Sequence, residues 1–273
     1  MENEFEEKPI EEEPETVEKE EKMEEEEKEE EEEEKEEEEE EEEEEYGEED
    51  EIVLKKLVEL LEDEDEKIRR SAVFLVGWYA EKGLMNESAL SKLVELLHDE
   101  DVAVRRGVVV VLGEYAEEGL TEDTAIPKLI ELLDDEDAEV REDAAEALGE
   151  YANQGLTDKS ALPKLIKLLD DEDAEVREDA AEALSAYAEA GLTDESALPK
   201  LVKLLDDEDE EVRGDVAFTL GKYAEASLTD ESALPKLVGL QQDEDEETRE
   251  KAAFALEKYA ERGLKNEAST KNS

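Results

Sequence analysis

The sequence contains no cysteine and only one histidine, His98. Without cysteine the chain can form neither a disulfide nor a thiolate nucleophile, and it cannot offer cysteine ligands to a metal ion. A single histidine leaves no recognisable Ser-His-Asp or Cys-His arrangement and excludes iron sites built from paired His-Glu motifs. Glycine loops of the nucleotide-binding types are also missing. We therefore predict no enzymatic activity, no metal site and no cofactor, and we interpret His98 as a surface residue.

Long apolar runs are absent as well. Purely apolar stretches such as Val108–Leu112 are far too short to span a bilayer, and no basic segment followed by an apolar run stands at the start. The chain is therefore predicted to be cytoplasmic, with no membrane partner. Its formal net charge of −62 repels nucleic acid and attracts basic proteins. The expected partner is a protein, possessing a basic segment, and no small-molecule substrate is predicted.

Acidic charge is concentrated at the N-terminus. Residues 1–50 contain 34 acidic and 5 basic side chains, including ten consecutive glutamates at 36–45. Such a segment cannot bury enough apolar surface to offset its conformational entropy, and like charges extend it. We predict a disordered, Glu-rich tail over 1–48, a folded region over 49–264 and a disordered end over 265–273.

A 36-residue repeat organises the folded region. The stretch LLDDEDAEVREDAAEAL occupies 132–148 and recurs unchanged at 168–184. An arginine recurs with the same period in six copies, an aspartate precedes it by six residues, and a tyrosine follows it by ten. The tyrosines are Tyr79, Tyr115, Tyr151, Tyr187, Tyr223 and Tyr259. A constant period of this length is typical of a stacked-repeat protein.

Each repeat has the apolar spacing of two helices. In one repeat, helix A covers about 160–169 with Ser160 as its cap, and helix B begins after Asp173 and ends at Gly191. Neither helix buries its apolar stripe alone, so neighbouring pairs are expected to share one core. The tyrosines are expected to pack their rings in this core and to bring their hydroxyls to the surface. The predicted fold is all-α: a right-handed α-solenoid of six helix pairs.

The pattern of an aspartate, then Val-Arg, then Ala-Ala-x-Ala-Leu-Gly, as in DEDAEVREDAAEALG, resembles HEAT repeats, and most closely the short type named after phycobilisome lyases. The resemblance covers about 51–264. It implies a structural ladder in which each Arg of helix B bonds the Asp of the turn, within and between repeats. The ladder residues would be Asp63, Arg69, Asp99, Arg105, Asp135, Arg141, Asp171, Arg177, Asp207, Arg213, Asp243 and Arg249.

The acidic turns and the last repeat have simpler interpretations. Carboxylates of the DDED turns at 134–137, 170–173 and 206–209 are the best metal candidates, but the spacing of a calcium-binding loop is missing, and helix caps and ladder partners explain them better. In the last repeat, polar Gln241, Thr248 and Glu257 replace the usual small or apolar residues. We predict that they form a polar terminal cap.

A binding surface is predicted on helix B. In HEAT-like stacks this helix lines the concave face, and positions one, two, five and nine after the Arg point away from the core. Aromatic side chains there flank an acidic centre, which would suit a protein segment with a basic middle. The alternatives are that tight curvature lets facing B helices or the chain ends cover these rings, or that they are isolated surface aromatics. The predicted partner-binding residues are Arg70, Phe74, Trp78, Arg106, Glu146, Glu182, Phe218, Lys222, Phe254 and Lys258.

Three functions are compatible with this sequence. The first is a non-enzymatic scaffold that binds a protein partner in the concave groove. In the second, the Glu-rich tail acts as a chaperone for basic proteins. The third, a chromophore lyase or an accessory factor for one, rests only on the resemblance to the repeat's namesake.

Overall fold

The structure is a computed structural model that describes residues 48–264. The predicted tail and C-terminal end therefore lie almost entirely outside the described residues. The chain divides into two units, residues 1–52 and 53–273, and the architecture below is that of the second. Within the described residues all regular structure is helical.

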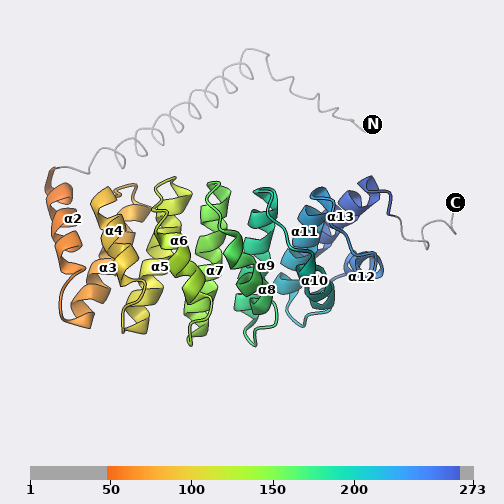
Figure 1. The fold of residues 1–273 in the computed structure, drawn as a ribbon, viewed down its shortest axis with the longest axis horizontal. Coiled ribbons are helices and arrows are strands. Elements are labelled where there is room, and N and C mark those ends of the chain that lie inside the picture. The colour runs from red at the N-terminus through yellow and green to blue at the C-terminus, as the bar shows by residue number, and fades with distance from the viewer. Residues whose placement is uncertain (1–47, 265–273) are drawn as a thin grey trace, which may run out of the picture. The chain divides into compact units, whose positions relative to one another are not determined.

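Six helix pairs follow one another in chain order (Figure 1). We call the first helix of each pair an A helix and the second a B helix. The A helices are α2 (Glu48–Leu60), α4 (Glu87–Leu96), α6 (Ala125–Leu132), α8 (Leu162–Leu168), α10 (Leu198–Leu204) and α12 (Ala233–Leu240). The B helices are α3 (Glu66–Glu81), α5 (Val102–Glu117), α7 (Ala138–Asn153), α9 (Ala174–Glu189), α11 (Glu210–Glu225) and α13 (Glu246–Glu261). Each B helix packs along the next, and the predicted α-solenoid is confirmed.

Helix ends follow the sequence signals, with one correction. Asp173 caps α9 by accepting a hydrogen bond from the backbone N–H of Glu175, as predicted. Gly191 has a φ of +82° just after α9, a conformation that a glycine adopts without strain. The prediction that Ser160 caps helix A is wrong, because Asp158 accepts from the N–H of Ser160 and a 3-10 turn, Lys159–Ala161, precedes α8.

The shared core contains the Leu, Val and Ala stripes of both helix types and the tyrosine rings. All six repeat tyrosines are buried, five of them completely. The hydroxyl of Tyr115 accepts a hydrogen bond from the backbone N–H of Asn86 at 3.1 Å. The expectation that the hydroxyls reach the surface is wrong for the five completely buried tyrosines, and burial raises the pKa of Tyr151 and Tyr223 to about 12.

Five arginine–aspartate contacts join successive repeats. Arg141, for example, donates from Nε and Nη2 to the two carboxylate oxygens of Asp171, at 3.0 and 2.9 Å. The other pairs are Arg69–Asp99, Arg105–Asp135, Arg177–Asp207 and Arg213–Asp243. Such two-pronged pairs are strong and directional.

Within one repeat, the expected bond between the Arg side chain and the Asp carboxylate is not formed. Arg141 Nη1 donates to the backbone carbonyl oxygens of Asp135 and Glu136, not to the Asp135 carboxylate. One guanidinium therefore ties the turn of its own repeat to the aspartate of the following repeat. Asp63 and Arg249, at the two ends of the series, have no Arg–Asp partner among the described residues; Arg249 keeps only its two carbonyl contacts.

A second ladder runs along the A helices and was not predicted. Each A helix after the first carries a lysine whose Nζ donates to a carbonyl oxygen near the end of the preceding A helix. The pairs are Lys92–Val58, Lys128–Val94, Lys164–Ile130, Lys200–Ile166 and Lys236–Val202, at 2.6 to 3.1 Å. These bonds satisfy carbonyl groups that a helix end leaves without an internal partner.

The last repeat corrects the predicted polar cap. Gln241 and Glu257 are exposed, but Thr248 is only 1% exposed. Its hydroxyl donates to the carbonyl oxygen of Glu210 at 2.9 Å, so this side chain faces the preceding repeat. Thr248 therefore belongs to the joint between the last two repeats.

Candidate functional site

The B helices present one row of side chains outside the core, at positions one, two, five and nine after the ladder arginine. We call this row the B face. The structure divides the predicted partner-binding residues on it into three groups, which differ in polarity. The first group lies on α3 and α5, the second on α7 and α9, and the third on α11 and α13.

The first group surrounds an apolar hollow of about 470 Å³. Phe74 is 71% exposed and Trp78 is 42% exposed beside it. Arg70 and Arg106 are at its edge, but both are already ion-paired with the following repeat. Arg70 Nη2 lies 2.7 Å from the Asp101 carboxylate, and Arg106 bonds Asp143 at 3.0 Å and also contacts Glu139. These arginines are therefore partly neutralised.

The second group is part of an acidic cluster that we call the acidic centre: Glu142, Glu146, Glu178, Asp179 and Glu182, on α7 and α9. Burial, followed by repulsion from Glu146 and Glu142, raises the pKa of Asp179 to about 8. Burial is also the first cause that raises the pKa of Glu142 and Glu178 to about 7. None of the five forms an ion pair with another described residue, whereas neighbouring Asp143 and Asp215 are paired with Arg106 and Lys251.

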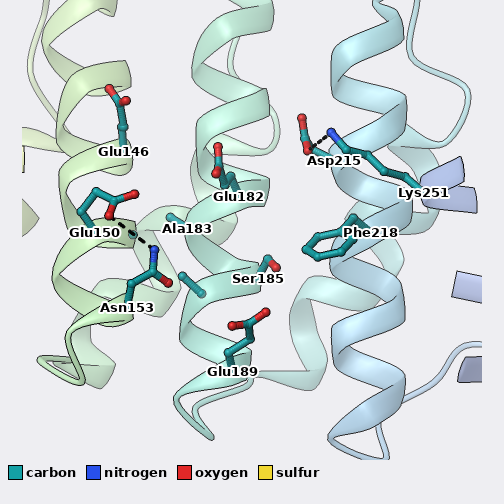
Figure 2. Close-up of a pocket in the computed structure, with 12 residues that line it drawn as sticks. Glu146, Glu150, Asn153, Glu182, Ala183, Ser185, Glu189, Asp215, Phe218 and Lys251 are labelled. Carbon is teal, nitrogen blue, oxygen red and sulfur yellow. Dashed lines mark hydrogen bonds and ion pairs between the residues drawn. The ribbon is translucent and has the colours of Figure 1, made fainter. Parts of the chain in front are cut away.

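Figure 2 shows the hollow that adjoins this centre, with a volume of about 390 Å³. Glu146 on α7, Glu182 on α9 and Asp215 on α11 lie in sequence across its upper part. Lys251 Nζ reaches Asp215 at 2.6 Å, and Phe218 closes the same side. The hollow is thus lined by carboxylates from all three helices, with the Phe218 ring on the side of Asp215.

The third group is packed against itself. The rings of Phe218 and Phe254 are stacked with centroids 5.0 Å apart. Lys222 Nζ lies 4.9 Å from the Phe218 ring centre, and Lys258 Nζ lies 5.3 Å from that of Phe254. Both lysines are also ion-paired, Lys222 with Glu189 and Lys258 with Glu225. Of the alternative interpretations of the rings, cover by another B helix describes Phe218 and Phe254, whereas Phe74 and Trp78 are exposed.

Several B-face residues of the apolar hollow and of the acidic region were not among the predicted partner-binding residues; they include Val110, Glu114, Glu142, Glu178, Asp179, Asp215 and Lys251. Each occupies position one, two, five or nine after its ladder arginine, so the helical wheel already placed them on this face. Glu114 is notable because its Oε2 is buried without a hydrogen-bond partner in the described part of the chain. Burial, then repulsion from Glu81, Glu117 and Glu146, raises its pKa to about 7.

No helix within residues 48–264 is both long and apolar enough to cross a membrane. The comparison with curated proteins gives no significant match. Among solved structures, an engineered protein is 32% identical to this chain with a TM-score of 0.63, and the match covers 75% of this chain and 97% of that one.

Designed armadillo repeat proteins are similar as well. One, in complex with the peptide (KR)4, is 31% identical with a TM-score of 0.62, covering 76% of this chain and 99% of that one. Another, from computationally designed armadillo repeat proteins for modular peptide recognition, is 30% identical with a TM-score of 0.58, covering 75% and 99%. The family model described as HEAT repeats matches three overlapping stretches, 54–149, 126–221 and 187–257. This chain belongs to the HEAT repeat family.

Proposed function

We propose that this chain is a non-enzymatic scaffold whose B face binds a lysine- and arginine-rich segment of a partner protein. The observation that carries the proposal is the acidic centre. Three of its carboxylates, those of Glu142, Glu178 and Asp179, are partly buried, whereas Glu146 and Glu182 are exposed beside them. None of the five is paired with a cation of the described chain. A cationic side chain placed among them would offset this repulsion, which water alone screens less well at a half-buried site.

The chemistry of the centre suits Lys and Arg better than other ligands. Carboxylates only accept hydrogen bonds when ionised, and Lys and Arg only donate them. Arg can also bond a carboxylate with two parallel N–H groups. An extended segment would follow the row of B helices and present a basic side chain to successive repeats, as Glu146 and Glu182 repeat at the 36-residue period.

One similar solved structure supports the class of ligand. It is a designed armadillo repeat protein in complex with the peptide (KR)4, an alternation of lysine and arginine. Another structure of this kind is described as built for modular peptide recognition. These are properties of those proteins, and they make a basic peptide the first ligand to test on this one.

The test is a titration of the full-length chain with fluorescently labelled (KR)4, followed by anisotropy at low and high salt. The triple variant Glu146→Gln, Asp179→Asn, Glu182→Gln is expected to weaken binding at least tenfold at both salt concentrations. The matched control, Glu95→Gln, Glu195→Gln, Glu231→Gln, removes the same charge from exposed positions on or beside the A helices. It is expected to change the Kd less than twofold. Equal losses in the two variants would contradict a specific site on the B face.

The acidic N-terminal segment is a second candidate for the same ligand, because residues 1–50 carry a net charge of −29. A polyglutamate segment would hold basic proteins through exposed charges, and added salt would screen them strongly. If this segment carries the binding, removing residues 1–47 abolishes it while the triple B-face variant does not. If the B face carries it, the truncated chain retains binding that persists at high salt.

A further inference from the structure

The apolar hollow on the first two repeats differs from every other part of the B face. It is lined chiefly by Val73, Phe74, Gly77, Trp78, Val110 and Val111. Val110 is 38% exposed, so three large side chains in one place face solvent: Phe74, Trp78 and Val110. Contiguous exposed apolar surface of this kind, in a hollow, is typical of a binding site.

The hollow continues into the acidic centre. Glu114 lines the hollow, and Glu146 of the acidic centre is close enough to raise the pKa of Glu114 electrostatically. Helix α5 carries Val110 of the hollow and also Arg106, which bonds Asp143 on α7. A ligand that runs along the B helices over the acidic centre would therefore reach the hollow without leaving the face.

The polar groups at the hollow indicate the character of its occupant. Arg70 and Arg106 are engaged with Asp101, Asp143 and Glu139, so an acidic segment gains little from them. The carboxyl group of Glu114 has a buried oxygen without a hydrogen-bond partner among residues 48–264, and Glu81 is also at the rim. The surroundings therefore favour a segment with an apolar side chain and a nearby N–H donor, and they disfavour the chain's own glutamate-rich residues.

The spacing follows from the stack. Adjacent packed helices lie about 8 to 10 Å apart, so two steps separate the α3–α5 hollow from the middle of the α7–α9 centre by roughly 16 to 20 Å. An extended chain advances about 3.3 Å per residue, which makes this distance about five or six residues.

Building on the proposed function, we propose that the hollow takes one bulky apolar side chain of the same basic segment, about five or six residues from the lysines and arginines that occupy the acidic centre. The partner's recognition sequence is then bipartite, with an apolar anchor and a basic run. The basic run supplies the charge complementarity, and the anchor fixes its register along the B helices.

Trp78 makes the hollow directly observable, because it is the only tryptophan of the chain. The test uses full-length protein and two sets of peptides in which Phe, Ala or Glu is joined to (KR)4 through a five-residue Gly-Ser spacer, placed before or after the basic run. In one of the two orders, the Phe peptide is expected to bind about tenfold more tightly than the Ala peptide and to shift the Trp78 emission to shorter wavelength. Shortening the spacer to one residue is expected to remove this advantage.

Phe74→Ser supplies the matched variant, since a side chain that is 71% exposed is dispensable for packing. In this variant the Phe and Ala peptides are expected to bind with equal affinity. Equal affinities in the unmodified protein, with unchanged Trp78 emission, would overturn the anchor while leaving the basic-peptide site intact. Failure of every peptide to bind would instead overturn the proposed function itself.

Two further measurements identify other occupants. If the Trp78 emission of the protein alone shifts with protein concentration, a second copy covers the hollow. If it moves to longer wavelength when residues 1–47 are removed, the chain's own N-terminal segment covers it. Either result would overturn the proposal that a partner's apolar side chain is the occupant.

Discussion

The first two repeats and the two middle repeats have the same skeleton but opposite B faces. Position five after the ladder arginine is Phe74 and Val110 in the first two, but Glu146 and Glu182 in the middle two. Every large apolar side chain that is exposed in residues 48–264 lies at or before Val110. Positions that join repeats hardly vary between these regions, whereas positions outside the core vary freely. This separation indicates where the chain is constrained by stacking and where it is available for recognition.

The largest expected effect tests whether the two regions share one ladder. Arg69→Ala, in the first repeat, and Arg177→Ala, in the fourth, should each destabilise the fold by about 3 kcal/mol, because Asp99 or Asp207 would be left as an unpaired, nearly buried carboxylate. Urea unfolding followed by circular dichroism measures the loss. Arg249→Ala is the control, since this arginine bonds only carbonyl oxygens in the described structure and should cost about 1 kcal/mol. Equal decreases in the free energy of unfolding at all three positions would mean that the arginine–aspartate pairs contribute nothing to stability.

Charge reversal tests whether the difference between the B faces decides binding. Glu146→Lys with Glu182→Lys should weaken (KR)4 binding at least a hundredfold, because two attractive contacts become repulsive beside the partly buried carboxylates of Glu142, Glu178 and Asp179. Phe74→Lys with Val110→Lys introduces lysines at the same positions of the first two repeats. This second pair should weaken (KR)4 binding by less than tenfold but remove the advantage of an apolar anchor. Similar losses of (KR)4 affinity from both pairs would show that only net charge matters.

The acidic centre should also make stability depend on pH. The folded-state pKa of Asp179 is about 8 and those of Glu142 and Glu178 are about 7, all above the ordinary value near 4. Between about pH 4 and pH 8 the folded chain therefore binds more protons than the unfolded chain. The contribution of these groups to the free energy of unfolding is greatest at the acidic end of this range and falls as pH rises through 7 to 8. We expect the Tm to be a few degrees lower at pH 8.5 than at pH 6.

Asp179→Asn should reduce this difference in Tm, since it removes the carboxyl group with the highest pKa of the centre. Asp123→Asn, at an exposed position in the turn before α6, is the control and should leave the difference unchanged. A Tm that rises between pH 6 and pH 8.5 would show that the carboxylates of the centre do not repel one another in the folded protein.

The fold was largely predictable because stacking repeats the same environment every 36 residues. Arg, Asp and Tyr recur in one register, and an aspartate precedes every B helix; the side chain of this aspartate caps five of the six B helices, as Asp173 does, and α7 is the exception. The lysine ladder escaped prediction for a physical reason. Lys164 bonds the backbone carbonyl of Ile130, and a backbone acceptor leaves no mark in the side-chain pattern. Lysines at such positions resemble solvated surface residues.

The candidate site was predictable only as a face. Helical spacing identified the side chains outside the core, but not which of them neutralise one another. The partners of Arg70 and Arg106 are 31 and 37 residues away, on the following repeat. Stacking of Phe254 on Phe218 also depends on Gly221, since a Cβ there would lie 2.6 Å from the Phe254 ring. Such contacts follow from the distance between helices, which the sequence pattern does not contain.

The smallest expected effect concerns the turns after the B helices, where the regions should not differ. Gly83, Gly119, Gly155, Gly191 and Gly263 have positive φ, and in the fifth repeat Ser227 adopts the same conformation with φ 69°. Ser227→Gly should stabilise the fold by about 0.5 kcal/mol, because relief of the left-handed strain exceeds the added chain entropy of glycine. The reverse change Gly191→Ser should destabilise the fold by a similar amount and no more, since a Cβ at 191 meets nothing within 4 Å.

Neither change should alter the affinity for (KR)4, because these turns lie outside the B face. A change in affinity would mean that the turns also help to set the spacing of the B helices, and recognition would then not be confined to the side chains that distinguish the two regions.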